Sequence, residues 1–191
     1  MARDVLVTEG VGEIKILGLA TRMGVSRSSF YWYFKDRSDL LDALLTEWEA
    51  RNTAQITAQC AKPAQTITEA ICNFFRCFID PRQFDRGLDF AVREWSRRDK
   101  KIRHRVDRAD VERLTAVVGL FERQGYAASD ADARARILYY MQLGYHALEV
   151  NEDMDTRMSR LPPYIHGFTG QEPDTAAVND FLSDVAKLGL S

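Results

Sequence analysis

The stretch that decides the fold runs from residue 19 to residue 35 and reads LATRMGVSRSSFYWYFK. It places a small residue, Ala20, four positions before a glycine, Gly24. Two short helices that cross steeply need a small residue at the crossing and a tight turn between them. Ser26 is a residue type that commonly caps the start of a helix. The stretch therefore predicts a helix-turn-helix, in which Val25 fills the space between the two helices.

The second of these helices is expected over residues 27–33 and carries a run of aromatic residues. Phe30 and Phe34 are four positions apart, so they share one helix face and are expected to pack inward. Three consecutive aromatic residues cannot all be buried on one face of a helix. We therefore expect at least some of this run to be exposed as part of a binding surface: Tyr31, Trp32 and Tyr33.

A helix of this kind binds DNA by placing its N-terminal residues against base edges in the major groove. Arg27 has the forked guanidinium that pairs with guanine, and serine hydroxyls bind bases or phosphates. Groups at the far end of the helix suit phosphates, which fix register and add affinity rather than specificity. The predicted base-reading face comprises Arg27, Ser28, Ser29, Tyr31 and Trp32, and the predicted phosphate contacts are Tyr33 and Lys35.

The charge distribution agrees with a polyanion-binding surface confined to one end of the chain. The 191 residues carry a net charge of −2, which argues against general binding to polyanions. Residues 14–37 nevertheless hold five basic residues and a single acidic one, whereas residues 149–191 hold eight acidic and three basic residues. A basic segment in a weakly acidic protein favours a local docking surface.

The remainder of the chain predicts an all-α fold, because apolar residues recur at helical spacing and no long alternating run occurs. The prolines fall between the periodic stretches and are interpreted as breaks between helices. We predict helices over residues 2–9, 14–23, 27–33, 37–60, 64–79, 86–97, 101–123, 130–152 and 174–188, with a long proline-rich loop over 159–173.

The run from Gly24 to Leu41 resembles the signature of TetR-family regulators, and the resemblance extends over about residues 2–49. It implies a three-helix DNA-binding domain at residues 1–45, followed by an all-helical ligand-binding and dimerisation domain at residues 46–191. Carried onto this sequence, it also implies that Lys15, at the start of the second helix, contacts the DNA backbone.

The resemblance further implies a homodimer in which the helices over 130–152 and 174–188 pair with a second subunit. Such a dimer would read a pseudo-palindromic operator, with recognition helices about 34–36 Å apart or a multiple of that. The expected function is a repressor released when a small molecule shifts the fourth helix. Family members usually carry a longer basic N-terminal arm than the few residues before Val5. The alternative is therefore a helical small-molecule sensor or interaction module that has lost DNA binding.

Aromatic residues in the middle of the chain are candidates for the ligand pocket, because the resemblance places the ligand among the middle helices. Gln142 and His146 are four positions apart and are plausible polar anchors in an apolar pocket. The competing interpretation is ordinary core packing, with a hydrogen-bonded core or interface histidine. The predicted ligand-binding set is Phe74, Phe78, Trp95, Tyr139, Gln142 and His146.

A second basic segment, residues 93–108, holds eight lysines and arginines against three acidic residues. A solvated helix face and turn is the interpretation we favour, and the alternatives are a nucleic-acid patch, or a site for an anionic effector or an acidic partner surface.

Enzymatic, metal-binding and membrane functions are not expected. The three histidines are scattered, no catalytic motif occurs, and Cys60, Cys72 and Cys77 match no metal-binding spacing. No apolar run approaches the ~20 residues of a transmembrane helix. Residues 1–12 lack the apolar core of a signal peptide. We therefore expect a cytoplasmic protein without cofactor or metal.

Overall fold

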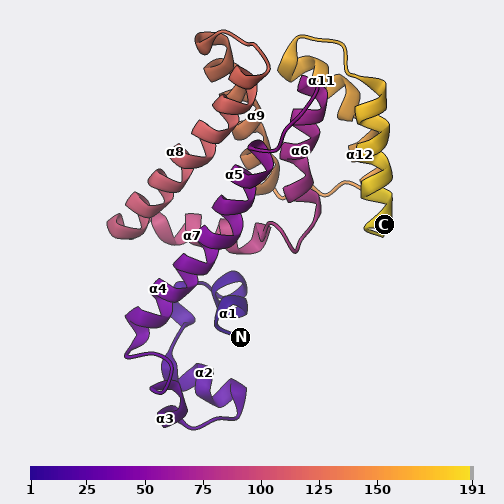
Figure 1. Cartoon of the computed structure of the whole chain (residues 1–191). Coiled ribbons are helices and arrows are strands. Elements are labelled where there is room, and N and C mark those ends of the chain that lie inside the picture. Colours follow the sequence, from indigo (N-terminus) through magenta and orange to yellow (C-terminus); the bar gives the residue numbers. More distant parts are fainter. Residues whose placement is uncertain (190–191) are drawn as a thin grey trace. The chain divides into compact units, whose positions relative to one another are not determined.

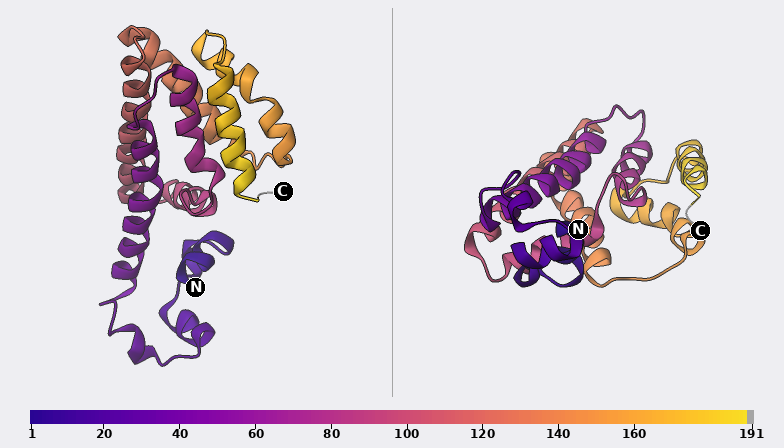
Figure 2. Two further views of the ribbon diagram at one scale, coloured as in Figure 1. Left: turned by 45° about the vertical axis from the view of Figure 1, so that its right-hand side comes forward. Right: turned by 90° about the horizontal axis from the view of Figure 1, so that it is seen from below.

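A computed structural model describes residues 1–189 of the chain, which form helices joined by short loops (Figures 1 and 2). No strand occurs in this range, so the predicted all-α fold is confirmed. None of the helices within it combines the length and the apolar character needed to cross a bilayer. Residues 190–191, the end of the predicted regulatory domain, lie outside the described residues.

The chain divides into two compact units. Unit 1 comprises Met1–Thr53 and Asp85–Ala109, and unit 2 comprises Ala54–Phe84 and Asp110–Ser191. This division by compactness differs from the functional division expected after residue 45, because residues 85–109 bury apolar side chains in the N-terminal core. The functional division stays a prediction.

Unit 1 is built around one continuous apolar core. Its largest fully buried member is Trp48, whose Nε1 donates a hydrogen bond to Asp89 Oδ1 at 2.7 Å. The elements of unit 1 are α1 (Ala2–Thr8), the 3₁₀ turn η1 (Val11–Glu13), α2 (Ile16–Met23), α3 (Arg27–Phe30), α4 (Arg37–Trp48), the π-helical turn η2 (Glu49–Thr53), α7 (Arg86–Ser96) and the first part of α8 (Lys100–Arg123).

The helix predicted over residues 37–60 forms as α4, η2 and α5 (Ala54–Cys60) in succession. Asp36 caps its start by accepting a hydrogen bond from Asp39 N. The buried residues of α4 are Leu40, Leu41, Leu44, Leu45 and Trp48. A π-helical turn widens the helix and is often found at functional positions. Asn52 in η2 is buried and exchanges two hydrogen bonds with the backbone of Asp85, which fixes the turn within unit 1.

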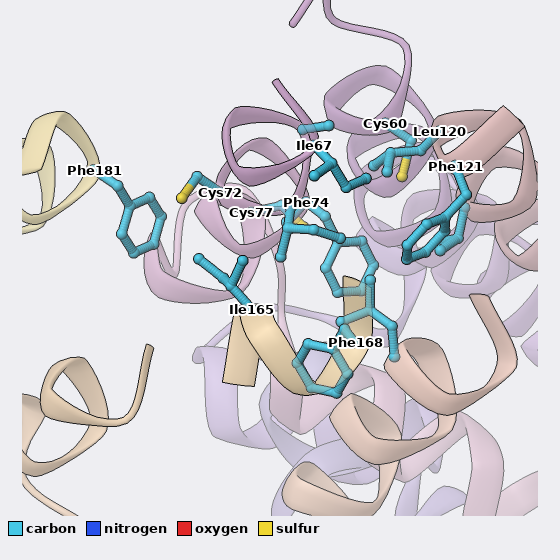
Figure 3. Close-up of a cluster of buried hydrophobic side chains, with 14 of the residues drawn as sticks. Cys60, Ile67, Cys72, Phe74, Cys77, Leu120, Phe121, Ile165, Phe168 and Phe181 are labelled. Atoms are coloured by element: carbon cyan, nitrogen blue, oxygen red, sulfur yellow. The ribbon is translucent and has the colours of Figure 1, made fainter. Parts of the chain in front are cut away.

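Unit 2 is a bundle arranged about α6 (Ile67–Ile79), which contacts α5, α11 (Leu161–Thr169) and α12 (Thr175–Lys187). Both views of the bundle place α12 beside α6 (Figures 1 and 2). The remaining elements are the second part of α8, α9 (Ala128–Ala147) and α10 (Met154–Ser159). Side chains from α5, α6, α8, α11 and α12 converge in one buried cluster, part of which is shown in Figure 3.

The loop predicted over residues 159–173 is wrong, because most of it is α11, preceded by the short helix α10. Pro162 and Pro163 lie in the first turn of α11. The first N–H groups of a helix have no partner within it, so prolines there lose no hydrogen bond and begin the helix instead of breaking it. The predicted helix over 130–152 is also corrected, since α9 begins at Ala128 and ends at Ala147.

Candidate DNA-binding surface and ligand cleft

The turn between α2 and α3 follows the steric logic of a helix-turn-helix. Gly24 adopts a left-handed conformation (φ 65°) that ends α2, and Ala20 is buried where α2 and α3 pack together. The Val25 side chain is 43% exposed, so its predicted role between the helices is wrong. Its backbone N–H is held by the Ala20 carbonyl at 3.0 Å, and the side chain is left largely outside the contact.

Ser26 caps α3 as predicted, since its Oγ accepts a hydrogen bond from Ser29 N at 3.2 Å. The same Oγ lies 2.7 Å from Ser28 Oγ and 2.9 Å from Ser29 Oγ. The helix is shorter than the predicted range 27–33, because it ends at Phe30 and the next three residues form a turn. Aromatic residues are weaker helix formers than straight-chain ones. In this turn the Phe30 carbonyl accepts hydrogen bonds from the backbone N–H groups of residues 33 and 34.

The aromatic run forms an exposed surface on this turn. Trp32 and Tyr33 are 83% and 81% exposed, and Tyr31 is 45% exposed, so the prediction that part of the run is exposed is confirmed. Phe30 and Phe34 are half-buried, with ring centroids 5.4 Å apart, on the inner side. Exposed aromatic rings in contiguous positions indicate an interaction surface.

The predicted cationic contacts are also exposed. Arg27 donates a hydrogen bond to Tyr31 Oη at 3.1 Å, which orients its guanidinium on the outer side of α3. Lys35 forms no ion pair with any described residue, and its backbone N–H donates to Asp39. Lys15 pairs with Glu13 at 3.1 Å, but both side chains are more than half exposed. Such exposed pairs are weak, so Lys15 remains available to a phosphate.

Two further arginines of the basic segment have structural partners. Arg37 donates to the carbonyls of Ile14 and Val11, both at 2.6 Å, and so ties the start of α4 to η1. Arg22 pairs with Glu9 of the segment after α1, and this hydrogen bond lowers the pKa of the Glu9 carboxyl. The exposed, loosely held cations of this segment are therefore Lys15, Arg27 and Lys35, which are the three predicted to bind DNA.

The second basic segment is largely neutralised within unit 1, as expected of a solvated helix face. Arg93 pairs with Asp89 at 2.9 Å, and Arg103 pairs with Asp107 at 2.8 Å. Arg105 reaches Glu49 at 2.8 Å, which lowers the pKa of the Glu49 carboxyl. Five of the eight cations of the segment are paired with carboxylates, whereas Arg98, Lys100 and Lys101 are exposed and form no ion pair with a described residue.

A cleft with mainly apolar walls lies within unit 2. The free space between its side chains is about 50 Å³, part of it open to solvent. Helices α6, α9, α11 and α12 supply the apolar lining, and α10 with the segment before it supplies most of the charged groups. The lining residues are Phe75, Phe78, Ile79, Met141, Gln142, Tyr145, Glu152, Arg157, Met158, Arg160, Leu161, Tyr164 and Phe181.

The charged groups form a small network beside the apolar walls. Glu152 accepts a hydrogen bond from Tyr145 Oη at 3.0 Å and pairs with Arg160. The bond from Arg160, followed by the one from Tyr145, lowers the pKa of the Glu152 carboxyl, so this group is ionised at neutral pH. The Arg157 guanidinium lies over the Tyr145 ring, 5.0 Å from its centroid.

The structure brings only part of the predicted ligand-binding set into this cleft. Phe78 and Gln142 line it. His146 does not, but its Nε2 lies 2.8 Å from Gln142 Nε2 and its ring packs on Phe78 and Phe84. His146 therefore stands behind Gln142, where it orients the amide.

The other predicted residues lie elsewhere. Phe74 and Tyr139 are buried in the core of unit 2, and Tyr139 Oη donates to Asp110 at 2.7 Å. Trp95 belongs to unit 1, where it packs against the core and lines a separate groove. Ligand contacts by these three residues stay untested predictions.

Sequence reasoning missed the polar residues of the cleft, because they fall in or next to the supposed loop. These residues are Glu152, Arg157, Arg160 and Tyr164. A signal was present: Leu161, Ile165 and Phe168 recur at helical spacing and are all buried in α11.

A helix-turn-helix that exposes aromatic rings and three loosely held cations is typical of a DNA-binding surface. Residues 1–44 match the family model for bacterial regulatory proteins of the tetR family. This match covers 44 of the 191 residues, so the N-terminal part of the chain is similar to the corresponding part of these regulators.

Nearly the whole chain is similar in fold to a solved structure. A Mesorhizobium loti protein assigned to the TetR-family transcriptional regulators superposes with a TM-score of 0.57, over 95% of this chain and 91% of that chain. At 13% sequence identity this likeness concerns the fold. No curated protein matches the sequence.

Proposed function

We propose that this chain is a repressor that a small molecule, bound in the cleft of unit 2, releases from operator DNA in the cytoplasm. The observation that carries the proposal is the pairing of two features in one chain: an exposed helix-turn-helix surface and an apolar cleft with a few polar groups. Ligand sites are typically lined by apolar and aromatic side chains with a small number of polar groups that fix orientation. The helix-turn-helix surface belongs to unit 1, and the cleft belongs to unit 2.

On DNA, Arg27 and the serines of α3 would face base edges, while Lys15, Tyr33 and Lys35 would hold phosphates. The exposed Trp32 would lie at the interface and lose its contact with water. Each phosphate contact adds affinity that falls with rising salt, whereas the base contacts supply the discrimination.

The proposed repressor is a homodimer, because a pseudo-palindromic operator needs two copies of α3. Helix α9 exposes Ile137 and Tyr140 on one face, with Leu148 directly after it, at 57%, 52% and 78% exposure. The apolar face of α12 instead packs inside unit 2, through Val178, Phe181 and Val185. Of the two helices expected to pair, α9 therefore has the apolar surface that a second copy would cover.

Release requires that a bound ligand change α4. The chain passes from α4 through η2 into α5, and α5 packs on α6, which lines the cleft. A π-helical turn is an adjustable point in a helix. We infer that a ligand acts on α4 along this route, and a coupling of about 1–3 kcal/mol would change operator affinity by about 5–150-fold.

Selection from a random duplex library, followed by fluorescence anisotropy, tests the proposal. The purified chain should select a two-fold symmetric sequence and bind it far more tightly than a scrambled duplex. A cleft ligand should then lower that affinity. Selection that yields no preferred sequence, together with ligand binding, would establish the sensor module without DNA function instead.

A further inference from the structure

We propose that the cleft of unit 2 takes a small molecule with an apolar body and one carboxylate, and that Arg157 binds the carboxylate. This inference rests on the proposed function in that the molecule is the releasing ligand, although its binding is measured separately. The apolar walls and the charged groups of the cleft both support this ligand class.

The walls of the cleft suit an aromatic or alkyl body. Phe75 and Phe78 of α6 are half-buried and line the cleft together with Met141 and Met158. Methionine side chains adapt to ligands of irregular shape. Removing an apolar body from water against such walls contributes roughly 25 cal/mol per Å².

Arg157 is the cation of the lining that forms no ion pair with a described residue, although its charge contributes to the lowered pKa of the Glu152 carboxyl. Its side chain is half-buried, and its guanidinium lies over the Tyr145 ring, yet no carboxylate among the described residues forms an ion pair with it. Partial burial of a charge is costly unless the charge is paired. A stacked guanidinium also keeps its edge free to donate two parallel hydrogen bonds, which matches a carboxylate.

The neighbouring acidic groups are already engaged. Glu152 is bonded by Arg160 and Tyr145, so it neutralises Arg160 and leaves the Arg157 charge over. Asp153 accepts from Thr156 N at 2.6 Å and from Thr156 Oγ1 at 3.0 Å, which caps α10. Among the residues that line the cleft, two guanidiniums therefore accompany one carboxylate, and one further anion would balance their charge.

The balance also argues against other ligand classes. A cationic ligand would meet Arg157 and Arg160 and would have to displace one of them from Glu152 or Tyr145. A neutral ligand would bury Arg157 further without pairing it, which raises the desolvation cost.

Titration calorimetry of the full chain with matched compounds tests the proposal. We choose 4-phenylbutanoate with its amide and its amine, and octanoate with octanamide, so that body and head group vary separately. The acids should bind about tenfold or more tightly than their amides, and the amine should bind least. Equal binding by acid and amide, or binding by none of the five compounds, would overturn the proposal.

Variants assign the effect to the residue. Arg157→Gln should abolish the preference for the acid and leave the affinity for the amide unchanged. Arg136→Gln removes an exposed arginine of α9 that pairs with Asp132, and it should change neither affinity. Glu152→Gln should have the opposite effect on the affinity for the acid. It removes the carboxylate that competes with the ligand for the guanidiniums, so the acid should bind more tightly. Circular dichroism confirms that each variant is folded, and an acid preference that survives in Arg157→Gln overturns the assignment.

A separate DNA-binding experiment distinguishes the two proposals. If the acid binds through Arg157 and lowers operator affinity, the proposed ligand class and the proposed release both hold. If it binds through Arg157 and leaves operator affinity unchanged, the ligand class stands and the proposed release fails.

Discussion

The DNA-binding surface and the ligand cleft are built in opposite ways. The surface comes from one stretch of about twenty residues in unit 1, whose exposed groups are set by a glycine turn and a serine cap. The cleft in unit 2 draws its lining from α6, α9, α10, α11 and α12, so more than a hundred residues separate its first and last members. Local steric rules determine the surface, whereas the cleft depends on how a whole bundle packs. Substitutions in the DNA-binding surface should therefore change DNA binding without changing the free energy of unfolding. Substitutions in the cleft should change ligand binding and the free energy of unfolding together.

The largest expected difference concerns thiol reactivity, because all three cysteines lie buried in unit 2. Burial raises the pKa of Cys60 and of Cys72 to about 12. Compared with a thiol of pKa 9.0, this lowers the thiolate fraction at pH 8 by about a thousandfold. Labelling with a disulfide reagent should accordingly be slower by about that factor in the native chain than in urea. Fast labelling of the native chain would show that the core of unit 2 opens readily.

Two aromatic residues give the next contrast. Phe74→Ala removes a fully buried ring from the core of unit 2 and should lower the free energy of unfolding by about 3–5 kcal/mol. Trp32→Ala removes an exposed ring and should change the free energy of unfolding by less than about 0.5 kcal/mol while weakening DNA binding. Urea unfolding followed by circular dichroism measures both. A large loss of stability in Trp32→Ala would mean that this ring is part of a core.

Arg27 and Lys35 should differ in kind on DNA. Arg27→Ala should cost about 1–3 kcal/mol of binding and relax the preference at one base position. Lys35→Ala should weaken binding to all duplexes alike and reduce the slope of log K against log salt by about 1. Anisotropy titrations on single-base operator variants, repeated across a salt series, separate the two outcomes. A uniform loss in Arg27→Ala would reassign Arg27 to a phosphate.

The smallest effect concerns the cap of α3. Ser26→Ala removes the acceptor for Ser29 N and should cost about 1 kcal/mol. Ser26→Asp retains a capping oxygen but adds a negative charge near the DNA, so it should keep the stability and lose operator affinity. Equal operator affinity in wild type and Ser26→Asp would place the start of α3 away from phosphates.

The same contrast explains what the sequence could and could not predict. Ala20, Gly24 and Ser26 act over a few residues, and their roles follow from sterics and capping alone. The predicted position of the Val25 side chain was wrong, because the conformation of the turn decides whether that side chain is exposed. The polar cleft residues were missed because the two prolines of α11 were interpreted as breaks, although they occupy a first helical turn that tolerates proline.

Residues that line the cleft are also hard to distinguish from core residues in a sequence. Phe74 and Phe78 lie on neighbouring turns of α6 and share the same pattern, yet one is fully buried and the other lines the cleft. Only the packing of α6 against its neighbours decides between the two. Trp95 was grouped with them by residue type, although it is partly buried against the core of unit 1.

The central claim is that the exposed aromatic and basic surface of unit 1 reads DNA. The most direct test compares the wild-type chain with a Trp32→Ala, Tyr33→Ala double variant by fluorescence anisotropy, on the selected operator and on a scrambled duplex. We predict tight, salt-sensitive and sequence-selective binding by the wild type, and at least about tenfold weaker operator binding by a variant of unchanged stability. Wild-type binding that does not distinguish the operator from the scrambled duplex, or a variant that binds as the wild type does, would contradict the claim.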